Sequence, residues 1–386
     1  MKVSRLVKRI SESATAKTKE MAEEIEKHGV KVVNLGIGEP DFDTPEPIRK
    51  AAYDALASGC THYTPSQGIP ELREAIAEKL KRENRIEAPP DNIIVTPGSK
   101  QAVYEAILTL VEEGDEVLIP TPAWVSYREM VKLAGGVVKE IRTDNTNFVL
   151  TPEVLEENIG NKTKLLILNS PNNPTGAVYS SKEIRDLAEV IMDHHIYVIS
   201  DEIYEKIIYE KEHFSIGSIP DMEDLTITVN GFSKCFAMTG WRLGYAAGPK
   251  EIISAMNKVQ QHTVTCAPSF VQKAGVVALN NESIWENYGK KMVEKFKERR
   301  DFLIKEFQDM GLHVKTASGA FYLFPDISRT NMTSTKFSEF LINKVGVIVT
   351  PGSAFGNYDN NIRVSYATSL ENLKEATERI KRVLEE

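Results

Sequence analysis

The sequence predicts an α/β fold, in which a mostly parallel β-sheet is covered by helices on both faces, followed by a smaller α+β domain. Two observations support this prediction. Between residues 45 and 278, helical patterns alternate with short apolar runs, the order expected of a sheet that is wound on both faces. Near Ile284 this alternation stops and a long, charged helical pattern begins. A chain of 386 residues is long enough for one large and one smaller domain.

The predicted strands of the large sheet are short apolar runs bounded by polar or turn-forming residues. They are Ile93–Thr96, Glu116–Pro120, Leu165–Asn169, Tyr197–Ser200, Thr226–Val229 and Leu243–Ala247. Between them, Gln101–Val111 has apolar residues at helical spacing and stops near Gly114. Ser181–His194 starts with a serine and a nearby glutamate, which is typical of a helix N-terminus.

The second domain is predicted from its own series of elements. They are the helix Trp285–Gln308, the strands Phe321–Phe324, Val345–Thr350 and Ile362–Tyr366, and the final helix Leu370–Leu384. The N-terminal pattern Met1–His28 is helical and has no strand partner of its own, so we expect it to pack with this domain. We therefore predict an N-terminal arm and part of the small domain in residues 1–44, a large domain in 45–284 and a small C-terminal domain in 285–386.

Composition excludes several classes of protein. A net charge of −8 and a pI near 5.6 argue against a nucleic-acid partner. The sequence contains no apolar run of membrane-spanning length, and its start lacks the apolar core of a signal peptide, so we expect a cytoplasmic protein without a membrane partner. Cys60, Cys235 and Cys266 are too far apart for a zinc motif and are interpreted as free thiols. His194 and His195 lack a spaced third ligand, so we predict exposed residues at a helix end and no metal site.

The run Val229–Gly248 (VNGFSKCFAMTGWRLGYAAG) contains the strongest indication of chemistry. The amine of Lys234 can form a Schiff base with an aldehyde once its pKa is lowered. Ser233 and Arg242 are suitable ligands for a phosphate held nearby. An aldehyde that carries a phosphate is pyridoxal phosphate. Most lysines are solvated surface charges, so this hypothesis depends on the residues around Lys234.

Ligands in open α/β sheets bind beyond the carboxyl ends of the strands. Asp201 follows such a strand and could pair with a protonated pyridine nitrogen, or it could cap a helix beginning at Glu202. Tyr204 comes three residues later, so its hydroxyl could point to the same side. Asn173, in Ser170–Gly176 (SPNNPTG), could donate from the opposite side, although turn formation would also explain this segment.

Three further segments carry residues suited to binding. Gly98 and Ser99 lie in Thr96–Lys100 (TPGSK), where a strand leads into a helix whose first amides could hold an anion. Trp124 offers an aromatic face for a flat ring, or else belongs to the core. Arg363 alternates with apolar residues in a predicted strand and is either solvated or a carboxylate ligand. The sequence has no Walker A pattern and no G-x-G-x-x-G.

With these motifs in view, the chain resembles fold-type I pyridoxal-phosphate enzymes, specifically class I aminotransferases and the bacterial and archaeal aspartate aminotransferase subgroup. The resemblance covers nearly the whole chain. Its motifs are Leu35–Thr44 (LGIGEPDFDT), Tyr63–Gly68 (YTPSQG), Ser170–Gly176, Ser200–Tyr204 (SDEIY), Val229–Gly244 and Ile362–Ala367. It implies a central seven-stranded sheet, a small domain built from both chain ends, and a homodimer whose active sites share residues across the interface.

The resemblance also implies roles for individual residues. It makes Lys234 the Schiff-base lysine, Asp201 the partner of the pyridine nitrogen, and Tyr204 and Asn173 the donors to the cofactor's phenolic oxygen. It places Trp124 against the ring, Gly98, Ser99, Ser233 and Arg242 around the phosphate, and Tyr63 of the second subunit beside them. It assigns the substrate's α-carboxylate to Arg363 and Gly38, with Asn173 near. Lys100 and Thr15 would bind a distal carboxylate, and Lys100 is also close enough to the phosphate turn to serve the cofactor.

The implied reaction is ping-pong transamination between an amino acid and a 2-oxo acid, with aspartate and 2-oxoglutarate as the expected pair. Prephenate, aromatic or other amino acids are alternatives. A carbon–sulfur lyase of the same fold is a further alternative, and release of pyruvate and ammonia from cysteine derivatives would identify it. A cofactor-sensing transcription regulator would need an additional DNA-binding region, which this acidic chain does not show.

Overall fold

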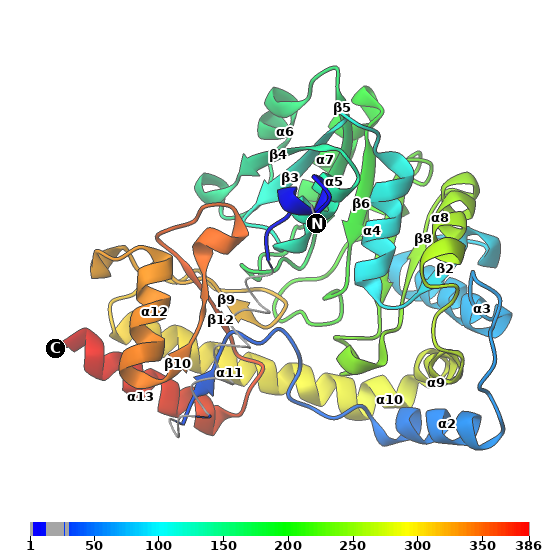
Figure 1. Ribbon diagram of the computed structural model, residues 1–386. Coiled ribbons are helices and arrows are strands. Elements are labelled where there is room, and N and C mark those ends of the chain that lie inside the picture. Colours follow the sequence, from blue (N-terminus) through cyan, green and yellow to red (C-terminus); the bar gives the residue numbers. More distant parts are fainter. Residues whose placement is uncertain (1–2, 13–26, 28–30, 386) are drawn as a thin grey trace.

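The computed structural model describes residues 3–12, 27 and 31–385. Its largest described sheet has seven strands, and Figure 1 shows helices packed around it. In spatial order the strands are β2 (Ile93–Thr96), β8 (Gly244–Ala247), β7 (Thr226–Gly231), β6 (Tyr197–Asp201), β5 (Thr163–Asn169), β3 (Glu116–Thr121) and β4 (Val137–Arg142). Only β8 runs antiparallel to its neighbours in this sheet. The predicted α/β class and mostly parallel sheet are confirmed.

Each apolar run predicted as a strand of this sheet forms one, with ends that shift by no more than a few residues. The strand that apolar runs did not reveal is β4, at the edge of the sheet. Its sequence, VVKEIR, carries three charged side chains, and Val137 is exposed. An edge strand has one side in solvent, so it needs fewer apolar residues than a central strand.

Both faces of the sheet are buried, because neighbouring residues along each strand point to opposite cores. On β5, Leu165 and Ile167 face the core formed with α4 (Ser99–Leu110), α5 (Ser126–Leu133) and α8 (Lys250–Thr263). Leu166 and Leu168 face the other side, which is covered by helices of the opposite layer. Those helices are α2 (Glu46–Ala57), α3 (Pro70–Lys79), α6 (Pro152–Asn158), α7 (Ser181–His194) and α9 (Ser269–Asn280).

In helix α7, the local sequence determines where the helix begins and ends. Ser180 accepts a hydrogen bond from the amide of Glu183, and the Glu183 carboxylate accepts one from the Ser180 amide in return. This capping box fixes the start of the helix where the sequence predicted it. The helix ends at His194, and His195 adopts a left-handed conformation, so both histidines are exposed, as predicted.

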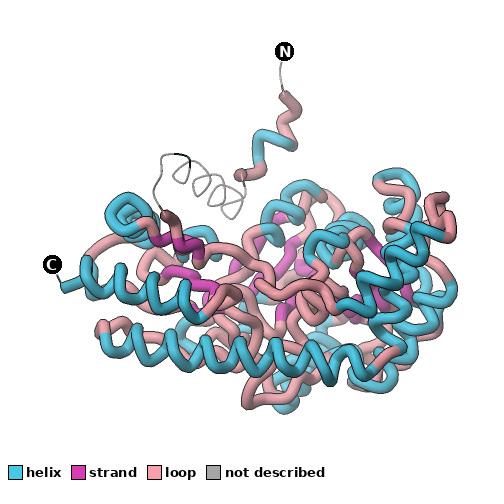
Figure 2. Tube along the Cα trace, turned by 90° about the horizontal axis from the view of Figure 1, so that it is seen from below, coloured by secondary structure: helices cyan, strands magenta, loops and turns pink. Residues whose placement is uncertain are grey.

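The second unit surrounds a three-stranded antiparallel sheet. Its strands are β11 (Thr350–Pro351), β12 (Ile362–Ser365) and β9 (Tyr322–Leu323), and its helices are α11 (Lys290–Asp309), α12 (Ser334–Val345) and α13 (Leu370–Glu385). The predicted helix Trp285–Gln308 begins instead as a short α10 (Glu282–Ile284) and a π-helical turn over Trp285–Gly289. Figures 1 and 2 show α11 running along one side of the molecule, from the small unit toward α9.

The beginning of the chain contacts both units. β1 (Val33–Asn34) pairs in parallel with β10 (Val347–Ile348) of the small unit. Farther toward the N-terminus, the Ser11 amide donates to the Glu129 carboxylate of α5, 2.9 Å away, in the large unit. Most of Met1–His28 lies outside the described residues, and the domain boundaries at residues 44 and 284 stay predictions. Within the described part of the chain, none of the helices combines the length and apolar character that crossing a bilayer requires.

Candidate active site

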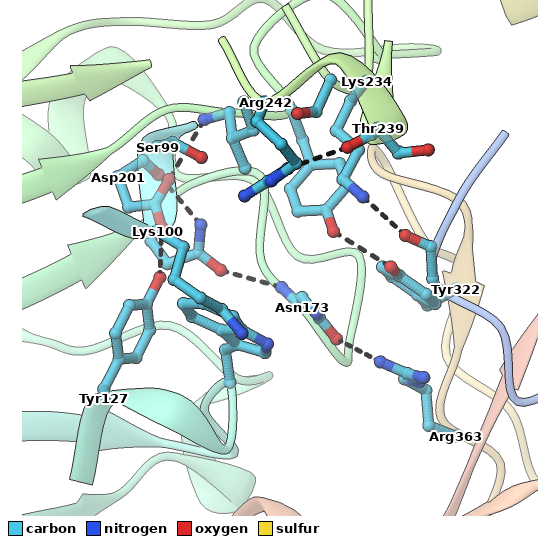
Figure 3. A pocket seen from close by; sticks show the side chains of 16 residues that line it. Ser99, Lys100, Tyr127, Asn173, Asp201, Lys234, Thr239, Arg242, Tyr322 and Arg363 are labelled. Carbon is cyan, nitrogen blue, oxygen red and sulfur yellow. Dashed lines mark hydrogen bonds between the residues drawn. The ribbon is translucent and has the colours of Figure 1, made fainter. Parts of the chain in front are cut away.

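The carboxyl ends of β5, β6 and β7 lie side by side, and polar side chains gather there. Asn169, the last residue of β5, is paired in register with Asp201, the last residue of β6. Asp201 is in turn paired with Val229 of β7. A cavity of about 370 Å³ opens at this edge, between the two units (Figure 3). The predicted location at the strand ends therefore coincides with a cavity.

Most of the residues selected from the sequence line this one cavity. They are Gly38, Ser99, Lys100, Trp124, Asn173, Asp201, Tyr204, Ser233, Lys234, Arg242 and Arg363. Gly98 does not line the cavity, but it is the N-cap of α4 and directly precedes Ser99, which does. Tyr63 is 87% exposed and does not line the cavity, so its role in a second subunit stays a prediction. Thr15 lies outside the described residues.

Asp201 is buried and held by hydrogen bonds. The Tyr127 hydroxyl donates to its Oδ2 at 2.6 Å, and the Ile203 amide donates to its Oδ1 at 3.3 Å. Residues 203–206 form a turn and no helix begins at Glu202, so Asp201 does not cap a helix there. Burial raises the pKa of Asp201 to about 6, while the Tyr127 hydrogen bond acts in the opposite direction. A partly desolvated carboxylate of this kind attracts a cationic partner strongly.

Lys234 occupies the opposite wall, in the loop between β7 and β8. Its Nζ donates to the Gly38 carbonyl at 2.5 Å and lies 5.9 Å from the centre of the Tyr204 ring. Burial lowers the pKa of this amine to about 8, and the positive charges of Arg363 and Arg242 act in the same direction. A lysine with a pKa near 8 has an appreciable neutral fraction at physiological pH, and the neutral amine can act as a nucleophile or a base.

The N-terminus of α4 forms an anion-binding wall together with Arg242. Gly98 has φ 89°, a conformation that strongly favours glycine, and a Cβ there would lie only 2.4 Å from Nη2 of Arg242. Glycine at this position thus lets the guanidinium approach the first turn of the helix. Arg242 Nη1 donates to the Thr239 carbonyl at 2.8 Å, which fixes the side chain. Free helix amides, Ser99 and a guanidinium together are suited to a phosphate.

Arg363, on β12, brings the small unit into the site. It is almost fully buried, and it donates to Asn173 Oδ1 at 3.1 Å and to the Gly36 carbonyl at 2.7 Å. Its Nε has no hydrogen-bond partner among the described residues. Its guanidinium lies 4.5 Å from the centre of the Tyr322 ring, which holds it from one side. Arg363 lines the cavity and has no carboxylate partner among the described residues, and a guanidinium in that position is suited to a carboxylate ligand.

Lys100 and Tyr204 lie farther along the cavity walls. Lys100 Nζ is 4.9 Å from the centre of the Trp124 ring, and burial and Arg242 both lower the pKa of Lys100. The hydroxyls of Tyr204 and Tyr322 are 3.0 Å apart, and desolvation raises the pKa of Tyr204. Both hydroxyls therefore remain neutral and able to donate.

Sequence reasoning missed five residues that line the cavity: Tyr127, Asn169, Ile203, Thr239 and Tyr322. Ile203 and Thr239 lie within motifs that were recognised, and Asn169 directly precedes one. Tyr127 comes three residues after Trp124 at the start of α5, which is the spacing of one helix face. That spacing is the signal that could have identified it.

A buried polar network lies under the Asp201 turn. Glu202, Glu205 and His213 come close enough together to resemble a metal-ligand set. The Lys79 ammonium and the Asn84 amide already contact these carboxylates, however. Burial alone would raise the pKa of Glu205, but Lys79 lowers it to about 2, so the carboxylate stays charged. The network is therefore balanced by a protein cation and fixes the chain that follows Asp201.

Comparison with known proteins gives a consistent result. A family model described as aminotransferase class I and II matches residues 30–380. An aspartate aminotransferase from Pyrococcus abyssi is 48% identical, covering 92% of each chain. An aspartate/prephenate aminotransferase from Thermus thermophilus is 45% identical, covering 99% of this chain and 98% of that one. The solved structure of Thermus thermophilus aspartate aminotransferase with maleate superposes with a TM-score of 0.97 at 45% identity, covering 99% of this chain and all of the other.

The chain belongs to the class I and II aminotransferase family and has the fold-type I architecture. It is an aminotransferase, an enzyme that moves an amino group between an amino acid and a 2-oxo acid.

Tyr127 provides a test of how Asp201 is controlled. Tyr127→Phe removes the donor to Oδ2, so the pKa of Asp201 should rise, because that hydrogen bond favours the charged form. If the ionised carboxylate is the active form, the acid limb of the pH profile of kcat/KM should move upward by about one unit. Tyr179→Phe, which alters a buried tyrosine bonded to the Leu150 amide, is the control. An acid limb at the parent's position in Tyr127→Phe would show that Tyr127 does not control Asp201.

Proposed function

We propose that this protein is a pyridoxal-phosphate-dependent aminotransferase that transfers an amino group from aspartate to 2-oxoglutarate. The observation that carries the proposal is the arrangement of charge around one cavity. The Lys234 amine, the Asp201 carboxylate, an anion-binding helix terminus and the Arg363 guanidinium all face the same space of about 370 Å³.

The donor set of the cavity suits the cofactor. Ser99, Ser233, Arg242 and the first amides of α4 would hold its phosphate, and Asp201 would hold its ring nitrogen. Trp124 would lie against its ring, and Asn173 and Tyr204 would approach its phenolic oxygen. When bound, pyridoxal phosphate supplies an aldehyde that condenses with amines and a protonated ring that withdraws electrons from the substrate's α-carbon.

Lys234 is the proposed base. Its Nζ, with a pKa lowered to about 8 by burial, takes the proton from the α-carbon of the amino acid. Asp201, held by Tyr127, keeps its negative charge toward the ring nitrogen throughout. Arg363 binds the α-carboxylate through its guanidinium, and Asn173 and Gly38 line the same cavity.

Lys100 is the proposed ligand of the second carboxylate of aspartate, with Thr15 assisting. Lys100 faces the cavity beside Trp124, and its desolvation favours an anionic partner. The solved Thermus thermophilus relative carries maleate, which is a dicarboxylate, and the relatives described above are named for aspartate. Lys100 also lies next to Ser99, so a contact to the cofactor phosphate is the competing role.

A homodimer with shared sites completes the proposal. Tyr53, Leu56 and Tyr63 are exposed within eleven consecutive residues, and exposed aromatic and aliphatic side chains of this kind are typical of an interface. Tyr63 would then reach the phosphate end of the partner's cavity.

Prephenate is the second candidate substrate, because the Thermus thermophilus relative is named for both aspartate and prephenate. The matched relatives are named aminotransferases, and this favours transamination over the carbon–sulfur lyase and the transcription regulator.

Lys234→Ala tests the proposed base. Loss of the amine should abolish steady-state transamination, because the variant has neither the nucleophile nor the proton acceptor. The measurement is 2-oxo acid formation from aspartate, with Lys273→Ala, a half-buried lysine on α9 paired with Glu71, as control. Near-normal turnover by Lys234→Ala would overturn the assignment.

Lys100→Ala tests the preference for aspartate. A charge-assisted contact contributes about 1.5–3 kcal/mol, so its loss should lower kcat/KM for aspartate by roughly one to two powers of ten. The value for an uncharged donor such as phenylalanine should change much less. Lys182→Ala, an exposed lysine on α7, is the matched control. Equal losses on both donors would mean that Lys100 serves the cofactor phosphate or the fold.

A further inference from the structure

Residues 36–44, which we call the strap, cross from the small unit to the large unit beside the cavity. The strap contributes Gly38 to the cavity wall. It begins after Leu35, which is bonded to the small unit through the Ile348 carbonyl and the Ser365 amide. It ends at Thr44, whose hydroxyl donates to the Ala237 carbonyl, 2.7 Å away, in the loop that carries Lys234. The strap is therefore fixed at both ends, to different units.

The carbonyls of the strap hold the basic residues of the site. The Gly36 carbonyl accepts from Nη2 of Arg363 at 2.7 Å, and the Gly38 carbonyl accepts from Nζ of Lys234 at 2.5 Å. A backbone carbonyl can fix a side chain only if the backbone that carries the carbonyl is itself fixed in position. Glycine has the largest backbone freedom, so the Gly36–Gly38 segment needs support from outside.

That support comes from Arg299 on α11. Its two terminal nitrogens donate to the two oxygens of Asp41, at 2.7 and 2.9 Å. The side chains of Arg299 and Asp41 are 10% and 28% exposed, so water screens this ion pair only partly. Phe42 packs edge-on against Phe296 of the same helix, with ring centres 5.6 Å apart, and the guanidinium lies 5.3 Å from the centre of Phe42.

We propose that Arg299 is a positioning residue for substrate binding, which acts through Asp41 to hold the strap so that the Gly36 carbonyl directs Arg363 toward the substrate carboxylate. The inference rests on the proposed role of Arg363. Arg299 does not line the cavity, so its effect passes through the strap. The bidentate geometry requires a guanidinium, because an ammonium cannot donate two parallel hydrogen bonds to one carboxylate.

The test compares Arg299→Met, Asp41→Asn, the double variant and Arg299→Lys in the cofactor-loaded enzyme. We expect KM for aspartate and the dissociation constant of maleate, a dicarboxylate probe that does not react, to rise about tenfold in Arg299→Met. The kcat value should fall by a smaller factor than KM rises, although the strap also carries the Gly38 carbonyl that accepts from Lys234. For Arg299→Lys, KM and the maleate dissociation constant should lie between those of the parent and of Arg299→Met. In the double variant, both constants should rise no more than in either single variant. Hydrogen exchange of the strap amides should be faster in Arg299→Met than in the parent.

Two controls make the outcome decisive. Lys297→Met, on the same helix but paired with Asp301, should leave KM, the maleate constant and strap exchange at the parent's values. Arg363→Lys should weaken the binding of both aspartate and maleate. If Arg299→Met matches the Lys297 control while Arg363→Lys weakens binding, the inference is overturned and the proposed function stands. A fall in kcat alone, with KM and maleate binding unchanged, would also overturn it. If Arg363→Lys leaves binding intact, the carboxylate site fails, and the inference fails with it.

Discussion

The proposed chemistry depends on one physical constraint, the burial of the Lys234 amine close to other positive charges. Burial, Arg363 and Arg242 all favour the neutral amine, while Glu39 and Asp201 oppose them. The balance brings its pKa to about 8, where both the charged and neutral forms are accessible near physiological pH. The same lysine on an exposed helix would stay protonated. The rest of the site supplies the walls and charges that create this environment.

Those walls come from two units, and the fold explains why they meet. The parallel strands β5 and β6 place Asn169 and Asp201 at the same edge, and β7 leads directly into the Lys234 loop. The small unit adds Arg363 and Tyr322 from neighbouring strands. Residues 36–44 connect the two units, so the positions of Arg363, the proposed carboxylate ligand, and of Lys234, the proposed base, are linked through one short segment of backbone.

Sequence reasoning reached the sheet, most of its strands and most of the cavity, because these depend on local patterns. Strand β4 was missed because its edge position leaves it polar, and the capping interpretation of Asp201 failed because the chain turns there instead of forming a helix. Tyr127 was missed for a different reason. Its spacing from Trp124 could have placed it at the cavity, but its partner Asp201 lies 74 residues away, and no local pattern predicts that hydrogen bond. Likewise, Arg299 and Asp41 are 258 residues apart.

The most direct test of the central claim is the pKa of Lys234 itself. The pH dependence of acylation at Lys234 can be followed by mass spectrometry of the cofactor-free protein, with exposed lysines in the same sample as internal references. The account predicts a midpoint near 8, well below the references. A midpoint near 10.5, the ordinary value for a lysine, would show that the cavity does not activate this amine and would contradict the account.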